Sequence, residues 1–148
     1  MTVVLRKMKI SDLHTIEKIE SVCQLGTWTM DSYLHEIRNP IARYIVAERD
    51  DQILGFAGAW CVVDEVQIMK VGVLPNYQGS GLGTMLMRAL DHIAMDEQCK
   101  QMTLEVKENN TKALNLYKKM GFFVSGHRSH YYPDGMGADL MTKILISK

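Results

Sequence analysis

The sequence has 148 residues, of which 47% are apolar and 23% are charged, a composition typical of a globular domain. Seventeen basic side chains balance seventeen acidic ones, so no net charge is available to attract nucleic acid or an anionic membrane. The longest apolar run, Ile53 to Val63, is too short to span a bilayer, and the three scattered cysteines form no disulfide framework. These features favour a single cytoplasmic domain over residues 1–148.

The chain begins with a strand pattern over 2–9, followed by two helical patterns. Ser11 is expected to cap the first helix, because a hydroxyl there can accept from the free N–H groups of the first turn. Thr29 or Asp31 is expected to cap the second helix in the same way. That helix is predicted to end before Pro40, because the residue before a proline avoids helical geometry.

The segment 43–60 is predicted to form a hairpin whose turn lies at 50–52, and 64–75 a further strand. In that strand Val66 and Ile68 share one face, but the apolar alternation resumes on the opposite phase from Met69. A β-bulge would produce this slip, and bulges occur beside active sites. A strand buried on both faces is the equally weighted alternative.

The remaining patterns alternate between helices and strands. A helix is expected from Leu82 to Ile93, a strand over 101–108, a helix over 110–120 ended by Gly121, and two strands near 122–129 and 140–145. This order predicts an α/β fold with a mixed sheet.

Three glycines, Gly79, Gly81 and Gly83, stand between a strand and a helix. Such a turn exposes backbone N–H groups at the positive end of the helix dipole, where an anion can bind. The spacing matches neither the dinucleotide fingerprint nor the Walker A loop, which requires a Gly-Lys pair that the chain lacks.

The spacing Q-x-x-G-x-G after "VGVLPNY" resembles the acetyl-coenzyme A signature of the GNAT acyltransferase superfamily. Downstream, "LEVKENNTKALNLYKKMGF" is similar to the next motif of that superfamily, and with the late "HYYPDG" the chain resembles RimI-type ribosomal-protein alanine N-acetyltransferases. The resemblance implies a mostly antiparallel central sheet flanked by helices, with splayed middle strands. It also implies acetyl-coenzyme A as co-substrate, no metal, and the N-terminal α-amine of a protein as acceptor, with a ribosomal protein as the expected substrate.

The resemblance assigns cofactor binding to two strand-and-turn segments and one helix start, namely Val71, Gly72, Val73, Gln78, Gly79, Ser80, Gly81, Leu82, Gly83, Thr84 and Asn110. The chain departs from the family pattern at Gly79 and Ser80, where such loops usually carry an Arg or Lys. Asn110 can also serve as a plain helix cap, and both roles are compatible.

Glu105 occupies the family position of the general base, and Tyr117 that of the acid that reprotonates the departing thiolate. From the residues alone, Glu105 also fits a solvated strand carboxylate and Tyr117 a core tyrosine. Trp28, Tyr131 and Tyr132 are candidates for the walls of a narrow acceptor slot, although each also fits a packing role.

Two other functions share the same cofactor residues. One is a GNAT enzyme that acetylates a small amine, such as a polyamine or amino acid, or a lysine side chain. The other is a module that binds acyl-coenzyme A as a sensor without turnover. The presence of both Glu105 and Tyr117 favours an enzyme.

Overall fold

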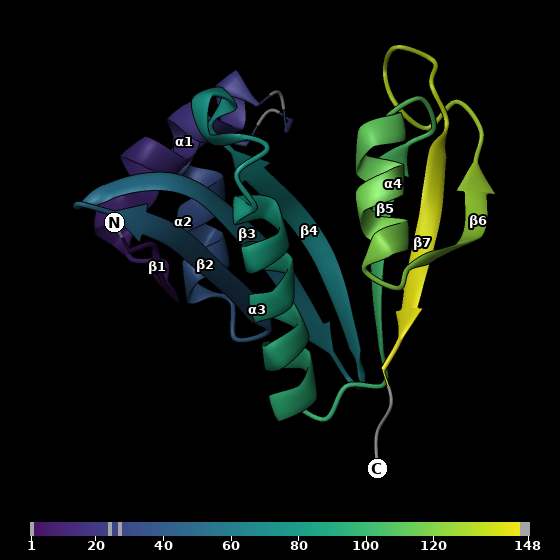
Figure 1. The fold of residues 1–148 in the computed structure, drawn as a ribbon, viewed down its shortest axis with the longest axis horizontal. Coiled ribbons are helices and arrows are strands. Elements are labelled where there is room, and N and C mark those ends of the chain that lie inside the picture. The colour runs from purple at the N-terminus through teal and green to yellow at the C-terminus, as the bar shows by residue number, and fades with distance from the viewer. Residues whose placement is uncertain (1, 24, 27, 146–148) are drawn as a thin grey trace.

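The computed structural model describes residues 2–23, 25, 26 and 28–145, and these form a seven-stranded sheet of order β1-β2-β3-β4-β5-β7-β6 (Figure 1). The strands are β1 Val4–Lys7, β2 Ala42–Arg49, β3 Gln52–Val62, β4 Glu65–Val73, β5 Gln101–Lys107, β6 Phe123–Arg128 and β7 Ala138–Ile144. The helices are α1 Leu13–Val22, α2 Met30–Arg38, α3 Leu82–Asp96 and α4 Thr111–Lys119. Short 3-10 turns cover Ile10–Asp12 and Pro75–Tyr77.

Each face of the sheet is covered by a pair of helices, which divides the apolar core into two clusters. Helices α1 and α2 cover one face, where Ile16, Tyr33 and Phe56 are fully buried. Helices α3 and α4 cover the other face, where Leu90 and Met102 are fully buried (Figure 1). Across the described ranges, no helix is both long and apolar enough to cross a membrane.

The predicted caps of the first two helices have different outcomes. Thr29 caps α2 as expected, because its hydroxyl accepts from the backbone N–H of Ser32 at 3.4 Å. The prediction for Ser11 is wrong, since Ser11 lies inside a 3-10 turn that precedes α1, and α1 begins after Asp12 with no side-chain cap. Asp12 accepts from the N–H of Lys9 at 2.7 Å and from the Arg6 guanidinium at 2.8 and 2.9 Å.

The predicted hairpin is formed by β2 and β3. Asp50 and Asp51 make its turn with positive φ angles of 52° and 62°, a geometry that matches the twist of the paired strands. Strand β3 is buried along most of its length because its apolar side chains meet helices on both faces of the sheet.

Strand β4 contains a bulge, which was one of the two equally weighted interpretations of its phase slip. Gly58 of β3 pairs with Lys70 but Ala59 pairs with Ile68, so Met69 is the extra residue. Beyond it, β4 leaves its parallel neighbour β5, and the two strands are paired only through 65–67 and 101–103. Figure 1 shows the resulting wedge-shaped separation, which confirms the splayed middle strands.

Helix α4 and the hairpin of β6 and β7 complete the sheet beyond the wedge. Asn110 caps α4 by accepting from the N–H of Ala113 at 3.1 Å, and Gly121, with φ of 97°, follows the end of the helix as predicted. Strand β7 is the last strand in the sequence, but it lies inside the sheet, between β5 and β6.

Candidate active site

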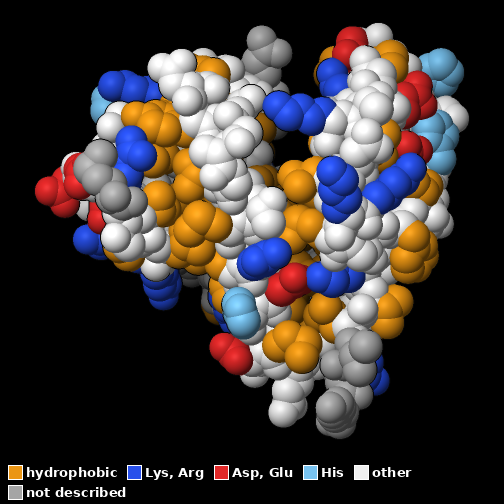
Figure 2. Space-filling model, in the orientation of Figure 1, with side chains coloured by type: hydrophobic (Ala, Val, Ile, Leu, Met, Phe, Trp, Pro, Cys, Tyr) orange, Lys and Arg blue, Asp and Glu red, His pale blue; other side chains and the backbone are white. Residues whose placement is uncertain are grey.

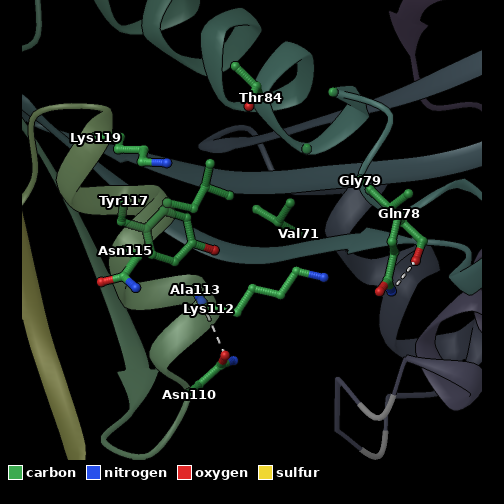
Figure 3. Close-up of a pocket in the computed structure, with 14 residues that line it drawn as sticks. Val71, Gln78, Gly79, Thr84, Asn110, Lys112, Ala113, Asn115, Tyr117 and Lys119 are labelled. Carbon is green, nitrogen blue, oxygen red and sulfur yellow. Dashed lines mark hydrogen bonds between the residues drawn. The ribbon is translucent and has the colours of Figure 1, made fainter.

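A cleft of about 720 Å³ opens between α4 and the glycine turn that leads into α3 (Figure 3). Its lining comes from the C-terminal end of β4, the glycine turn and one face of α4. The lining residues are Val71, Val73, Gln78, Gly79, Gly81, Gly83, Thr84, Asn110, Lys112, Ala113, Asn115, Leu116, Tyr117 and Lys119. Eight of the eleven predicted cofactor residues are in this set.

The β4 wall of the cleft presents backbone N–H groups without a strand partner. The N–H of Leu74 donates to Leu54 of β3 at 2.9 Å, and in an antiparallel ladder alternate residues point the same way. The N–H groups of Val71 and Val73 therefore point away from β3, into the wedge that β5 has left. Amides in this position can bind a carbonyl or amide oxygen of a ligand.

The glycine turn closes the other end of the cleft. Gly79 and Gly81 adopt positive φ angles of 80° and 90°, which glycine reaches without steric cost. Gly81 is the N-cap of α3 and contributes no side-chain cap, so the N–H groups of the first turn are free for a ligand. Apart from its chain neighbours and the backbone of its own helix, a Cβ on Gly83 would meet no atom of the described residues within 4 Å, so packing does not require glycine there.

Three predicted cofactor residues do not line the cleft, and for Gly72 the structure gives a different role. A Cβ on Gly72 would lie 2.8 Å from Leu25 and 3.2 Å from Ile19, so this glycine permits close packing on the opposite face of the sheet. The Ser80 hydroxyl donates to the carbonyl of Tyr77, and the Leu82 side chain is buried in the core. Only the backbone groups of Ser80 and Leu82 are available to a ligand.

Tyr117 lies on the cleft face of α4, with its hydroxyl directed into the cleft (Figure 3). Its ring packs edge-on against Phe122 at a centroid distance of 5.9 Å. Burial raises the pKa of this hydroxyl above its ordinary value, because the phenolate would be poorly solvated. The group therefore holds its proton at neutral pH and can donate it.

Glu105 lies on the opposite face of β5 from α4. Its strand neighbours Leu104 and Val106 belong to the core beneath α4, and alternation turns Glu105 the other way. The nearest cation is Arg128 on β6, with Nη2 4.0 Å from Oε1 of Glu105. The negative charge of Glu105 also raises the pKa of the Tyr131 hydroxyl, which indicates that the two groups are close.

The residues predicted to bind the acceptor lie in two separate regions of the structure. Tyr131 and Tyr132 pack edge-on at 5.1 Å beside Glu105, and the connection that carries them is held by an ion pair of Lys107 with Asp134 at 2.8 Å. Trp28 packs against Tyr33, with ring centroids 5.3 Å apart. Within the described ranges no aromatic contact joins Trp28 to the two tyrosines.

Five lining residues were not predicted from the sequence: Lys112, Ala113, Asn115, Leu116 and Lys119. All belong to α4. Their spacing of three and four residues places them on one helix face together with Tyr117. This periodicity was visible in the sequence, but nothing in it indicated that the face would line a cleft.

The family model for the acetyltransferase (GNAT) family matches residues 10–122. The chain belongs to this family. The match includes β4, the glycine turn and α4, and so covers every residue that lines the cleft.

The acetyltransferase has relatives that match it along nearly their whole length. It is 36% identical over 144 residues, covering 97% of this chain and 95% of the other, to a protein of Bacillus subtilis (strain 168) named as a candidate ribosomal protein bS18-alanine N-acetyltransferase. It is 30% identical, over 90% of both chains, to the ribosomal protein bS18-alanine N-acetyltransferase of Haemophilus influenzae.

Solved structures share the fold at lower identity. The ribosomal-protein-S18-alanine N-acetyltransferase of Escherichia coli superposes with a TM-score of 0.91 at 24% identity, covering 99% of this chain and 97% of that one. The PaiA N-acetyltransferase of Thermoplasma acidophilum, solved in complex with coenzyme A, gives a TM-score of 0.81 at 18% identity, covering 98% of this chain and all of that one. These neighbours confirm the predicted fold class.

Proposed function

We propose that this acetyltransferase transfers an acetyl group from acetyl-coenzyme A to the N-terminal α-amine of a protein, with a ribosomal protein as the substrate class. The observation that carries the proposal is the 36% identity, over 97% of this chain, to a relative named as a candidate for that reaction. A ribosomal-protein acceptor implies that the enzyme works in the cytoplasm.

The residues of the cleft fit coenzyme A. The free N–H groups at the start of α3 suit a diphosphate, and the open space before Gly83 allows it to approach the backbone. The amides of Val71 and Val73 suit the amide-rich pantetheine arm and the thioester carbonyl. Acetyl-coenzyme A supplies the activated acetyl thioester, and the residues of the chain position it and move protons.

Proton transfer is divided between the two faces of the sheet. Glu105, on the side of Tyr131, accepts a proton from the acceptor ammonium, directly or through water, so that the neutral amine can attack. Tyr117, on the side of the cleft, donates its proton to the departing sulfur. The mechanism requires the acceptor amine to reach the thioester through the wedge between β4 and β5, which are unpaired beyond residues 67 and 103.

The experiment is an acetylation assay with a panel of acceptors. The panel contains peptides that begin with Ala, Ser or a larger residue, the same peptides with a blocked N-terminus and an internal lysine, and spermidine. We expect the acetyl group on the α-amine of peptides with a small first residue, located by tandem mass spectrometry. Modification of spermidine or of lysine side chains, with α-amines untouched, would overturn the proposal.

A further inference from the structure

The glycine turn contains no cation, although it faces the position proposed for a diphosphate. Residues 78–84 read QGSGLGT, so the turn offers N–H groups, neutral polar side chains and the helix dipole, but no charged group. The dipole corresponds to roughly half an elementary charge, whereas a diphosphate diester carries two negative charges. A site made only from the turn would leave most of this charge unbalanced.

The opposite wall of the cleft carries two ammonium groups. Lys112 and Lys119 are both lining residues, and no Asp or Glu lines the cleft among the residues that the structure places. Neither lysine takes part in an ion pair with a described carboxylate. The cleft is therefore a region of positive charge in a chain whose formal net charge is zero.

The position of Lys112 follows from the geometry of α4. Lys112 is the second residue of the helix and Lys119 the last, and a separation of seven residues, close to two turns, puts both on one face. Figure 3 shows Lys112 extending from α4 towards Gln78, with its ammonium between the helix and the glycine turn. Figure 2 shows basic side chains over α4 beside the hollow that separates it from the rest of the molecule.

We propose that Lys112 binds the diphosphate of coenzyme A from the α4 wall and replaces the cation that the glycine turn lacks. The diphosphate then lies between the N–H groups of α3 on one side and a single ammonium on the other. A lysine suits this role because its flexible stem brings a point charge to the ligand. This inference rests on the proposed use of acetyl-coenzyme A.

The test compares Lys112→Met with Lys118→Met, which changes a lysine of the same helix that does not line the cleft. Isothermal titration calorimetry measures the affinity of each variant for coenzyme A, for dephospho-coenzyme A, which lacks the 3′-phosphate, and for pantetheine, which has no phosphate. We expect Lys112→Met to weaken binding of both nucleotides about tenfold, as for a lost charge-assisted hydrogen bond, and to leave pantetheine unaffected. Lys118→Met should bind like the wild type, and Lys112→Arg should retain most of the affinity.

The binding measurements distinguish a failure of the Lys112 role from a failure of the proposed function. Unchanged nucleotide affinity in Lys112→Met, or an equal loss in Lys118→Met, would overturn the role of Lys112. A loss seen with coenzyme A and not with dephospho-coenzyme A would place the ammonium at the 3′-phosphate and also overturn it. Failure of the wild type to bind coenzyme A at all would instead overturn the proposed function.

Discussion

The ammonium of Lys70 lies 4.2 Å from the centroid of the Trp28 ring. The same ammonium forms an ion pair with Glu20, and the two side chains are only 7% and 3% exposed. Glu20 also accepts from the Tyr33 hydroxyl at 2.6 Å. Lys70, one residue before Val71 on strand β4, thus contacts both Trp28 and Glu20 of α1.

Removing one member of this buried pair should be costly. Lys70→Met leaves the Glu20 carboxylate buried without its cation, and we expect a loss of about 3–5 kcal/mol in the free energy of unfolding. Lys70→Met combined with Glu20→Gln should recover part of that loss, because no unpaired charge remains. Urea denaturation measures both values.

A matched control for this pair is Lys100→Met. Lys100 pairs with Asp64 at 3.8 Å, and the side chains are 73% and 50% exposed, so the loss should be no more than about 1 kcal/mol. Equal losses for Lys70→Met and Lys100→Met would contradict the importance of the buried pair.

Gly83→Val tests the cleft without disturbing the fold. Gly83 is inside α3 with no protein atom in the path of a Cβ, so valine should leave the melting temperature unchanged or raise it. The side chain would occupy space assigned to coenzyme A, and we expect the dissociation constant to rise at least about tenfold. Met85→Val, at an exposed position of the same helix outside the cleft, is the control. Tight coenzyme A binding by Gly83→Val would contradict the assigned position of the ligand.

The sequence predicted those parts of the site that depend on local signals. The glycine turn and the Asn110 cap are each encoded within a few neighbouring residues, and the phase slip at Met69 indicated a bulge as one of two equally weighted interpretations. Gly72 was assigned to the cleft from its place in a motif. After the bulge, the alternation of β4 places Gly72 on the face of the sheet opposite the cleft, where Leu25 packs against it.

Features that depend on how distant segments meet were not predictable in this way. Lys112 lines the cleft only because α4 packs on β5 opposite the glycine turn, a relationship between segments some thirty residues apart. Ser11 failed as a cap because residues 10–12 form a 3-10 turn, so α1 begins after Asp12, whose carboxylate accepts from Lys9 and Arg6 and makes no cap hydrogen bond to α1.

Tyr117→Phe should separate proton donation from packing. The variant keeps the ring contact with Phe122 and loses the hydroxyl, so turnover should fall by ~10²–10⁴ while the affinity for coenzyme A stays unchanged. In the wild type, burial raises the pKa of this hydroxyl above about 10, so its ionisation should not reduce turnover at any lower pH. Tyr77→Phe, outside the cleft, is the control, and steady-state kinetics with calorimetry provide the readouts. Normal turnover in Tyr117→Phe would assign the proton to another donor.

Asp12 should make the stability of the fold depend on pH in the acid range. The hydrogen bonds from Arg6 lower the pKa of Asp12 below its ordinary value of 3.8. The folded state therefore favours the carboxylate, and this stabilisation is present above pH 3.8 and lost as the pH falls through the folded-state pKa. Asp12→Asn should lower the free energy of unfolding at pH 7 by roughly 1–3 kcal/mol, with the difference shrinking below pH 4.

The control for Asp12 is Asp51→Asn, in the hairpin turn, where asparagine tolerates the positive φ. Urea denaturation of both variants and the wild type from pH 3 to pH 7 gives the comparison. A constant difference between Asp12→Asn and the wild type over this range would show that ionisation of Asp12 is not its source.

Glu105→Gln should change the pH dependence of turnover as well as its size. Without the base, the reaction relies on acceptor that is already neutral, and the α-amine of a peptide has a pKa of about 7.7–8.0. The residual rate should therefore rise about tenfold per pH unit below that value and level off above it, whereas the wild type should vary less steeply. Glu108→Gln, a carboxylate that follows the same strand and bonds to His127 at 3.3 Å, should keep the wild-type profile. The measurement is the turnover rate from pH 6 to pH 9 with saturating acetyl-coenzyme A. Parallel pH profiles for Glu105→Gln and the wild type would mean that Glu105 does not accept the proton.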